Sequence, residues 1–381
     1  MSYRLITRQD EFESVIEHAQ NHGPVALDTE AASFHRYHDR VYLAQLTAGG
    51  ETSVIDPLGL ESFEPFGRLL ADPAVEKVFH DADYDLRLLH HEFGFQPRRL
   101  FDTRIAAQLL GEPGIGLGSL LEKYLGLKPD KRFQRADWSA RPLTGGMLDY
   151  AAGDTSHLLE LRGILRTQLV DRQRLAWAEE EFVLIEQTRW EPGEADPRES
   201  FIRLKGARDL DRRGLALLRE LYDWRETTAA RLDRASFRVM GNEVLLHLSA
   251  HPVRTIDELA RVKSVGPDQA AKRGGEVLAA IERGLEVPDA ELPKFERGPR
   301  RVPPDPELDA RLDRLKARRN QLAEEYGLQP GVLCPNGTLE AIARANPQSV
   351  DEMKGVPGLR EWQRNELGGD LLAVMAPDPT A

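Results

Sequence analysis

The stretch of sequence that decides the fold is Val25-Ala26-Leu27-Asp28-Thr29-Glu30. A Gly23-Pro24 break precedes it, and a short apolar run then leads directly into two carboxylates at positions i and i+2. Side chains two residues apart on a strand project from the same face, and two charges about 4 Å apart repel by about 4 kcal/mol at an effective dielectric near 20. The pattern therefore favours a strand that ends at a cation site, although two solvated acids at a strand end are also compatible with Asp-x-Glu alone.

The flanking residues alternate between strand-like and helix-like patterns. We predict further strands over 41–47, 52–57 and 77–80, and helices over 58–70, 85–93, 102–110, from about 119, over 147–154 and throughout 161–188. Strands that come first and then alternate with helices predict an α/β domain with a mixed sheet flanked by helices.

The C-terminal half carries an all-helical segment twice. Residues 255–259 and 274–281 are echoed by 349–353 and 368–375, with a Pro-rich stretch between the two copies. A repeated helical module of this length is the simplest account. We predict a catalytic domain over 1–195, a first helical module over 205–287, a linker over 288–306, and a second, diverged module over 307–377.

Composition excludes several classes of protein. The 381 residues include 63 Asp and Glu against 51 Lys and Arg, a formal net charge of -12, which disfavours a protein coated in basic residues that binds any polyanion. The single cysteine, Cys334, excludes an intrachain disulfide and a thiolate metal cluster. The sequence has neither a stretch of about 18 apolar residues nor an apolar signal-peptide core, so we expect a soluble cytoplasmic protein without a membrane partner.

Further acids follow the first pair. Asp85 lies just after a predicted strand, at the start of a helix, and Tyr150 and Asp154 stack on one helical face at i, i+4. Each motif alone is more often structural, because acids at a helix N-terminus are favourable by about 0.3–1 kcal/mol. Four carboxylates and a tyrosine on separate elements together suit a two-metal phosphodiester site. Mg²⁺ or Mn²⁺, which prefer oxygen ligands, are the expected cofactors.

These motifs resemble those of the ribonuclease D family of DEDDy 3'–5' exonucleases. Residues 25–30, 80–86 and 150–154 resemble its three exonuclease motifs, and the resemblance extends through 101–104, 138–144, 203–207 and 221–226 over nearly the whole chain. It implies an RNase-H-like fold followed by two HRDC domains, the helical domain shared with RecQ-type helicases.

The resemblance also implies roles. Asp28, Glu30 and Asp154 would hold one metal ion, Asp28 would bridge to a second, and Asp85 would act on the second, through water. Tyr150 would orient the attacking water, because a phenol of ordinary pKa near 10 positions water more readily than it abstracts a proton. The implied reaction removes nucleotides from RNA 3' ends, such as those of tRNA precursors, and releases 5'-monophosphates. A DNA-directed exonuclease and a non-catalytic RNA-binding scaffold are the alternatives.

Weaker signals leave two interpretations open. Trp138 and Arg141 suit either stacking on a base with pairing to a phosphate, or packing of their own loop. The basic run 294–301 suits RNA contact or a solvated tether. The loop 263–267 suits phosphate binding at a helix N-terminus or simple capping. The Gly-rich run 114–118 follows a predicted helix rather than a strand, so no dinucleotide partner is expected.

Overall fold

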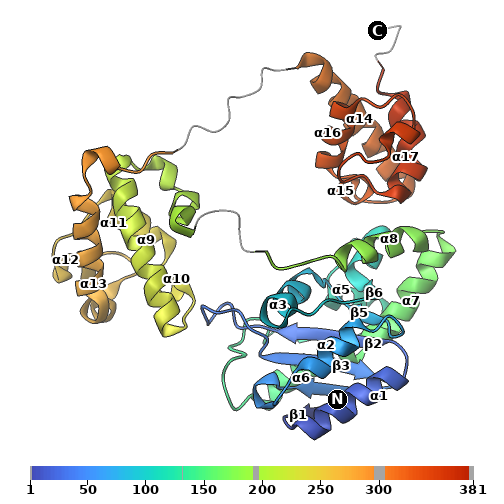
Figure 1. The fold of residues 1–381 in the computed structure, drawn as a ribbon, viewed down its shortest axis with the longest axis horizontal. Coiled ribbons are helices and arrows are strands. Elements are labelled where there is room, and N and C mark those ends of the chain that lie inside the picture. Colours follow the sequence, from blue (N-terminus) through green and yellow to red (C-terminus); the bar gives the residue numbers. More distant parts are fainter. Residues whose placement is uncertain (1, 131, 192–196, 296–304, 377–381) are drawn as a thin grey trace. The chain divides into compact units, whose positions relative to one another are not determined.

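The N-terminal part of the chain is built on one mixed six-stranded sheet. The computed structural model describes residues 2–130, 132–191, 197–295 and 305–376. The strands are β1 (Arg4–Ile6), β2 (Val25–Glu30), β3 (Leu43–Ala48), β4 (Glu51–Ile55), β5 (Lys77–Phe79) and β6 (Leu100–Asp102). Their order in the sheet is β1-β4-β3-β2-β5-β6, with β3 antiparallel to β2 and β4, and the other pairs parallel. The predicted α/β class is confirmed (Figure 1).

Strand β2 is central, and helices cover both of its faces. Val25 and Leu27 join a core with helices α1 (Gln9–Asn21), α2 (Glu64–Ala71) and α3 (Asp83–Phe93). Ala26, on the opposite face, joins a core with α4 (Thr103–Leu109), α5 (Leu117–Leu125), α7 (Leu158–Asp171) and α8 (Leu175–Ile185). Since side chains alternate along a strand, the even-numbered Asp28 and Glu30 share the face of Ala26.

Two predicted helices are each divided in the structure. The helix predicted over 58–70 is a short 3₁₀ turn (Pro57–Gly59) followed by α2, because Pro65 is tolerated only in the first turn of a helix. The helix predicted over 161–188 is α7 followed by α8, and Gln173 between them has a left-handed φ of 57°. The three-residue strands β1 and β6 were not predicted.

The described residues form two compact units. One comprises those within 1–31, 41–190 and 302–381, and the other those within 32–40 and 191–301. The second unit holds α9 (Arg212–Leu232), α10 (Ser236–Val239), α11 (Asn242–Ala250), α12 (Ile256–Ala260) and α13 (Gly266–Glu286). The C-terminal part of the first unit repeats this order with α14 (Pro306–Tyr326), α15 (Pro330–Leu333), α16 (Asn336–Ala345), a 3₁₀ turn (Asp351–Met353) and α17 (Glu361–Ala373). The predicted all-helical architecture of the C-terminal half is therefore confirmed.

The second helical module packs directly on the catalytic domain within the first unit. Trp362 at the start of α17 stacks on Trp177 of α8, with ring centroids 4.5 Å apart and an interplanar angle of 13°. The Arg360 guanidinium pairs with Glu181 at 3.0 Å, and the Glu180 carboxylate accepts the backbone N–H groups of Glu361 and Trp362. One hydrophobic core runs across this contact, so the module is part of the catalytic unit.

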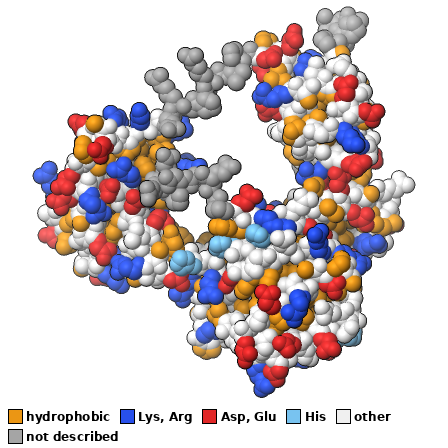
Figure 2. Space-filling model, viewed as in Figure 1, with side chains coloured by type: hydrophobic (Ala, Val, Ile, Leu, Met, Phe, Trp, Pro, Cys, Tyr) orange, Lys and Arg blue, Asp and Glu red, His pale blue; other side chains and the backbone are white. Residues whose placement is uncertain are grey.

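The predicted linker and the basic run 294–301 fall in part on residues that the structure does not describe. Residues 296–304, the centre of the predicted linker and most of the basic run 294–301, lie outside the described residues. No helix in the described ranges is both long and apolar enough to cross a membrane. Acidic and basic side chains are interspersed over the face in Figure 2, in keeping with a net charge that is spread over the surface.

Candidate active site

Three of the predicted metal ligands meet at the end of β2. Asp28 and Glu30 project from the strand, and Asp154 comes from helix α6 (Gly145–Ser156), which lies on the same face of the sheet. One carboxylate oxygen from each of the three lies within 4.8 Å of the others. All three remain partly accessible to solvent, so a cation can reach them.

Helix α6 is held close to the sheet by small residues and one polar contact. Ala151 and Ala152 are fully buried, and Thr155 Oγ1 accepts a hydrogen bond of 2.9 Å from Thr47 Oγ1 of β3. Small side chains permit close approach of a helix to a sheet. The i, i+4 spacing then places Tyr150 one turn before Asp154 on the same side of the helix.

Asp85 approaches from the other face of the sheet. It lies in the first turn of α3, is buried, and its Oδ1 accepts hydrogen bonds from the backbone N–H and the hydroxyl of Thr29. Thr29 is the residue between Asp28 and Glu30, so Asp85 is tied to the strand that carries the other two acids. The four predicted acids and Tyr150 are therefore brought together.

Asp102 holds in place the turn that leads to Asp85, and we did not predict it as a site residue. It is fully buried at the end of β6, and its carboxylate accepts the N–H groups of Asp81 and Ala82 at 3.2 and 2.8 Å, and of Arg104 and Ile105 at 2.7 and 3.1 Å. It thus caps α4 and holds the turn that leads into α3. Its one sequence signal is an acid followed by Thr103 at the start of a predicted helix.

Crowding and burial change the ionisation of the acids. Burial raises the pKa of Asp28 and of Glu30 well above the ordinary value, and the neighbouring carboxylates raise it further. Burial also raises the pKa of Asp85 and of Asp154 to about 7. The pKa of the Tyr150 phenol rises above its usual value, first because of burial and then because of the charge on Asp154, so the hydroxyl stays protonated and acts as a donor.

A buried amide supports the fit of the site to a hydrated cation. Gln45 of β3 lies directly opposite Asp28 in the antiparallel ladder, so their side chains share one face. It is fully buried, and among the described residues neither its Oε1 nor its Nε2 has a hydrogen-bond partner. An unpartnered buried polar group costs about 1–3 kcal/mol. Metal-bound water beside Asp28 would satisfy both atoms. The sequence signal for Gln45, which we missed, is one amide in an otherwise apolar strand.

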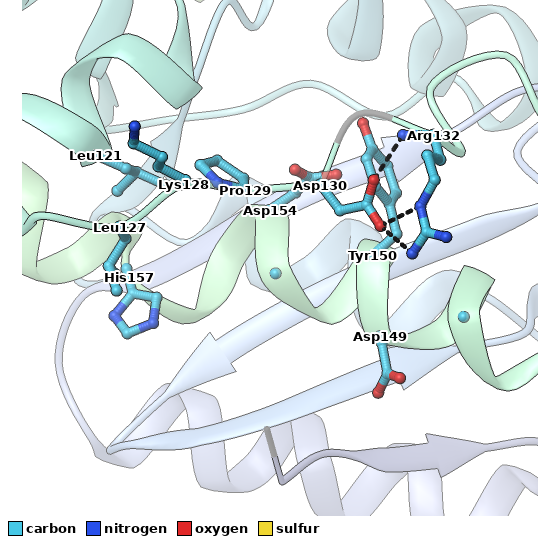
Figure 3. A pocket seen from close by; sticks show the side chains of 12 residues that line it. Leu121, Leu127, Lys128, Pro129, Asp130, Arg132, Asp149, Tyr150, Asp154 and His157 are labelled. Carbon is cyan, nitrogen blue, oxygen red and sulfur yellow. Dashed lines mark hydrogen bonds and ion pairs between the residues drawn. The ribbon is translucent and has the colours of Figure 1, made fainter.

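A pocket of about 360 Å³ opens beside Tyr150 and Asp154. Leu121, Leu127 and Pro129 give it an apolar wall, and α6 contributes Gly146 and Gly153 to its lining. Figure 3 shows the Tyr150 and Asp154 side chains on the side of α6 that faces the Asp130–Arg132 ion pair, whereas Asp149 points away. The pocket therefore has room for a planar apolar group next to the acidic cluster.

The structure corrects the prediction that Trp138 and Arg141 contact RNA. Trp138 is 1% exposed, with its ring centroid 6.0 Å from that of Tyr150, so its face is not available for stacking on a base. The Arg141 guanidinium forms a bidentate pair with Asp56 at 2.7 and 2.9 Å and donates to the carbonyl oxygens of Trp138, Ala140 and Tyr42. Both side chains pack their loop against the sheet, which is the other interpretation of the sequence.

The raised pKa values predict how stability depends on pH without metal. Unfolded Asp has a pKa near 4, while Asp85 and Asp154 titrate at about 7 when folded. Between these values the folded protein binds more protons, so its stability falls as pH rises. In chelator, we expect the unfolding temperature to fall by about 5 °C or more from pH 5 to pH 7, as measured by differential scanning calorimetry. Manganese should remove most of this fall, because a cation replaces the protons. An equally steep fall in Asp85→Asn would contradict the assignment.

Comparisons with known proteins agree with this architecture. A family model described as a 3'–5' exonuclease matches residues 3–170, and a model of the HRDC domain matches residues 214–281 and 309–375. The first match contains the four acids and Tyr150. The second confirms that the helical modules are HRDC domains.

Full-length relatives are also found. The chain is 34% identical over 375 residues to ribonuclease D of Granulibacter bethesdensis, covering 97% of this chain and 92% of the relative. It is 32% identical to ribonuclease D of Escherichia coli over 295 residues, covering 77% and 78% of the two chains. The crystal structure of Escherichia coli RNase D, described as an exoribonuclease involved in structured RNA processing, superposes with a TM-score of 0.69 at 27% identity, covering 98% of this chain and 99% of the other.

Proposed function

Because this chain belongs to the ribonuclease D family of 3'–5' exoribonucleases, we propose that the acidic cluster at the end of β2 is its active site and that its substrates are the 3' ends of structured RNAs such as tRNA precursors. The observation that carries the proposal is the convergence of Asp28, Glu30 and Asp154 within 4.8 Å of one another beside Tyr150. We further propose cytoplasmic action and the domain boundaries given above.

The family is metal-dependent, and the residues present suit Mg²⁺ or Mn²⁺. Asp28, Glu30 and Asp154 would hold a divalent ion, and Asp85 would face a second from the opposite face of the sheet. When bound, such ions lower the pKa of an attacking water and stabilise the charge that develops on the phosphate. They also supply the positive charge that the acidic cluster itself lacks.

The chain's own groups then have separate tasks. The protonated Tyr150 hydroxyl donates a hydrogen bond and so orients a water molecule for in-line attack on the last phosphodiester. Asp85 stays in place through its two bonds from Thr29. The pocket beside Tyr150 suits a nucleobase, since one wall is apolar and its volume is about 360 Å³. Hydrolysis of the terminal linkage releases a 5'-monophosphate and leaves a new 3'-hydroxyl.

Two alternative functions are a DNA-directed exonuclease and a non-catalytic binding scaffold. The charge of the site argues against the scaffold, and an experiment distinguishes all three. A binding scaffold has no use for four desolvated acids that repel one another, so the crowding supports catalysis. The test is a time course with RNA and DNA oligomers of the same sequence, labelled at the 3' or the 5' end, with and without magnesium or manganese. Immediate release of the 3' label from RNA with metal is expected. Faster release from DNA would favour a DNA-directed enzyme, and no release from either would favour the scaffold.

Tyr150→Phe tests the role of the hydroxyl. The change removes one donor and keeps the ring that packs near Trp138, so metal binding and RNA binding should be retained. We expect the single-turnover cleavage rate to fall by about 10²-fold or more, the contribution of a well-placed acid–base group. Tyr326→Phe, whose hydroxyl contacts Glu366 of the second HRDC domain, is the control and should cleave at the parent rate. Equal rates in both variants would exclude the role.

A further inference from the structure

The first HRDC domain carries an open groove with a basic lining. The groove, about 660 Å³ in volume, runs from the end of α11 past α12 to the loop before α13. Its basic lining residues, all exposed, are His247, His251, Arg254, Arg261 and Lys263. Glu258 is the one acid that lines it. A chain of net charge -12 thus presents a local excess of positive charge here.

Three cations of the groove form no direct hydrogen bond or ion pair among the described residues. The charge of Arg261 acts on Glu258 only weakly, because its effect on the pKa of that carboxyl is smaller than that of the backbone N–H groups. Elsewhere in this domain arginines pair with acids, as Arg213 does with Asp289 at 2.6 Å and Arg283 with Glu220 at 3.1 Å. Over the described residues, by contrast, the side chains of Arg254, Arg261 and Lys263 form neither a hydrogen bond nor an ion pair. The Glu258 carboxylate is occupied, because it accepts the N–H groups of Arg254 and Thr255 at 2.8 and 3.2 Å.

The second HRDC domain provides an internal comparison. Aligning residues 255–259 with 349–353 places Gln348, Gly355 and Pro357 at the positions of Arg254, Arg261 and Lys263. The backbone arrangement is nevertheless shared, because the N–H of Gln348 donates to Glu352 at 2.8 Å, as that of Arg254 does to Glu258. The fold therefore does not require basic side chains at these positions, and their presence in the first copy needs another explanation.

We propose that this groove binds the phosphodiester backbone of RNA upstream of the 3' end, and that the second HRDC domain, which lacks the three cations, serves to dock on the catalytic domain. This inference rests on the proposed function. Arginine and lysine form charge-assisted hydrogen bonds with phosphate, and release of counterions from the strand makes such binding favourable. The groove is lined by two histidines and by no Phe, Tyr or Trp among the described residues, so it contacts backbone more readily than it stacks bases.

The test is the triple variant Arg254→Gln, Arg261→Gln and Lys263→Gln in the full-length protein. Binding of a fluorescent single-stranded RNA of about 20 nucleotides is followed by anisotropy in chelator, where no cleavage occurs, over a range of salt. Each lost phosphate contact lowers the slope of log Kd against log salt by about 0.7 for a single strand. We therefore expect the slope to fall by about 2, with at least about tenfold weaker binding at low salt. A DNA strand of the same sequence should show the same loss, because the contacts are to phosphate.

A matched control separates the groove from total charge. Lys205→Gln, Lys272→Gln and Lys354→Gln remove the same charge from exposed residues that do not line the groove, and should leave the slope near that of the parent. An equal loss in the control, or parent affinity and slope in the groove variant, would overturn the proposal and favour a protein ligand. The groove variant should still cleave a dinucleotide at the parent rate. Absence of cleavage in the parent itself would instead refute the proposed function.

Discussion

Asp28→Asn should abolish hydrolysis and, at the same time, the stabilisation of the protein by manganese. Burial raises the pKa of Asp28, and the charges of Asp85, Asp154 and Glu30 raise it further. Asparagine keeps the size of the side chain and removes the charge, so the affinity for a divalent ion falls. If the lost ion had stabilised the transition state by about 4 kcal/mol or more, cleavage falls at least about 10³-fold.

The effect of manganese on the unfolding temperature reports metal binding and can be measured without cleavage of RNA. A ligand that binds only the folded protein raises its stability by mass action, by about 2.7 kcal/mol at 100 times its dissociation constant. The unfolding temperature of the parent should therefore rise with manganese, while that of Asp28→Asn should change much less. In chelator the variant should be more stable than the parent, since one repulsive charge is gone. Asp149→Asn, five residues before Asp154 on α6 and pointing away from the cluster in Figure 3, is the control. A manganese response equal to that of the parent in Asp28→Asn would show that the ion binds elsewhere.

The acidic set was predictable because each member carries a local pattern. Asp28 and Glu30 share a face through the period of a strand, and Tyr150 and Asp154 share one through the period of a helix. What the pattern does not contain is the distance between elements. The 4.8 Å cluster exists because Ala151 and Ala152 let α6 approach the sheet and because Thr47 bonds Thr155 across 108 residues of sequence.

The supporting residues were not predictable for the same reason. In the sequence, Gln45 is only one amide in an apolar strand. Its place opposite Asp28 is set by the antiparallel ladder, which the sequence does not contain. The sequence marks Asp102 only as a helix cap. In the structure β6 lies beside β5, and this places the second carboxylate oxygen of Asp102 within reach of the N–H of Ala82. Conversely, Trp138 and Arg141 have residue types that suit nucleic-acid contacts, but burial and the pairing with Asp56 commit them to their own loop.

Docking of the second HRDC domain was also missed. The sequence places every predicted ligand before residue 155, and it gives no sign that either helical module packs on the catalytic domain. The buried Trp177 and Phe182 of α8 indicate that this helix packs on something, but neither identifies a segment about 180 residues later. In our proposal the first HRDC domain binds RNA through three cations that its counterpart lacks.

Ending the chain at residue 295 should destabilise the catalytic domain although it removes none of the proposed ligands. The truncation uncovers the face of Trp177 that stacks on Trp362 and leaves Glu180 and Glu181 without their α17 partners. Exposing a fully buried large apolar side chain costs about 1.5–3 kcal/mol, and the truncation uncovers several of the core shared by the two domains. We therefore expect the unfolding temperature to fall by about 10 °C, as measured by calorimetry, together with aggregation at high concentration. An unchanged unfolding temperature would mean that the second HRDC domain is only tethered.

Point variants separate docking from the loss of a whole domain. Trp177→Ala alters the catalytic side and Trp362→Ala the HRDC side of the same stacked pair, and Trp362 also donates from Nε1 to Glu181 at 3.1 Å. If the two surfaces are in contact, the double variant should be less destabilised than the sum of the singles, with a coupling of about 1 kcal/mol for an aromatic pair. Additive effects in urea unfolding would show that each tryptophan stabilises only its own domain. Because removal of Trp177 leaves the acids of β2 and α6 unchanged, Trp177→Ala should cleave a short oligomer at the parent rate at temperatures well below its unfolding transition.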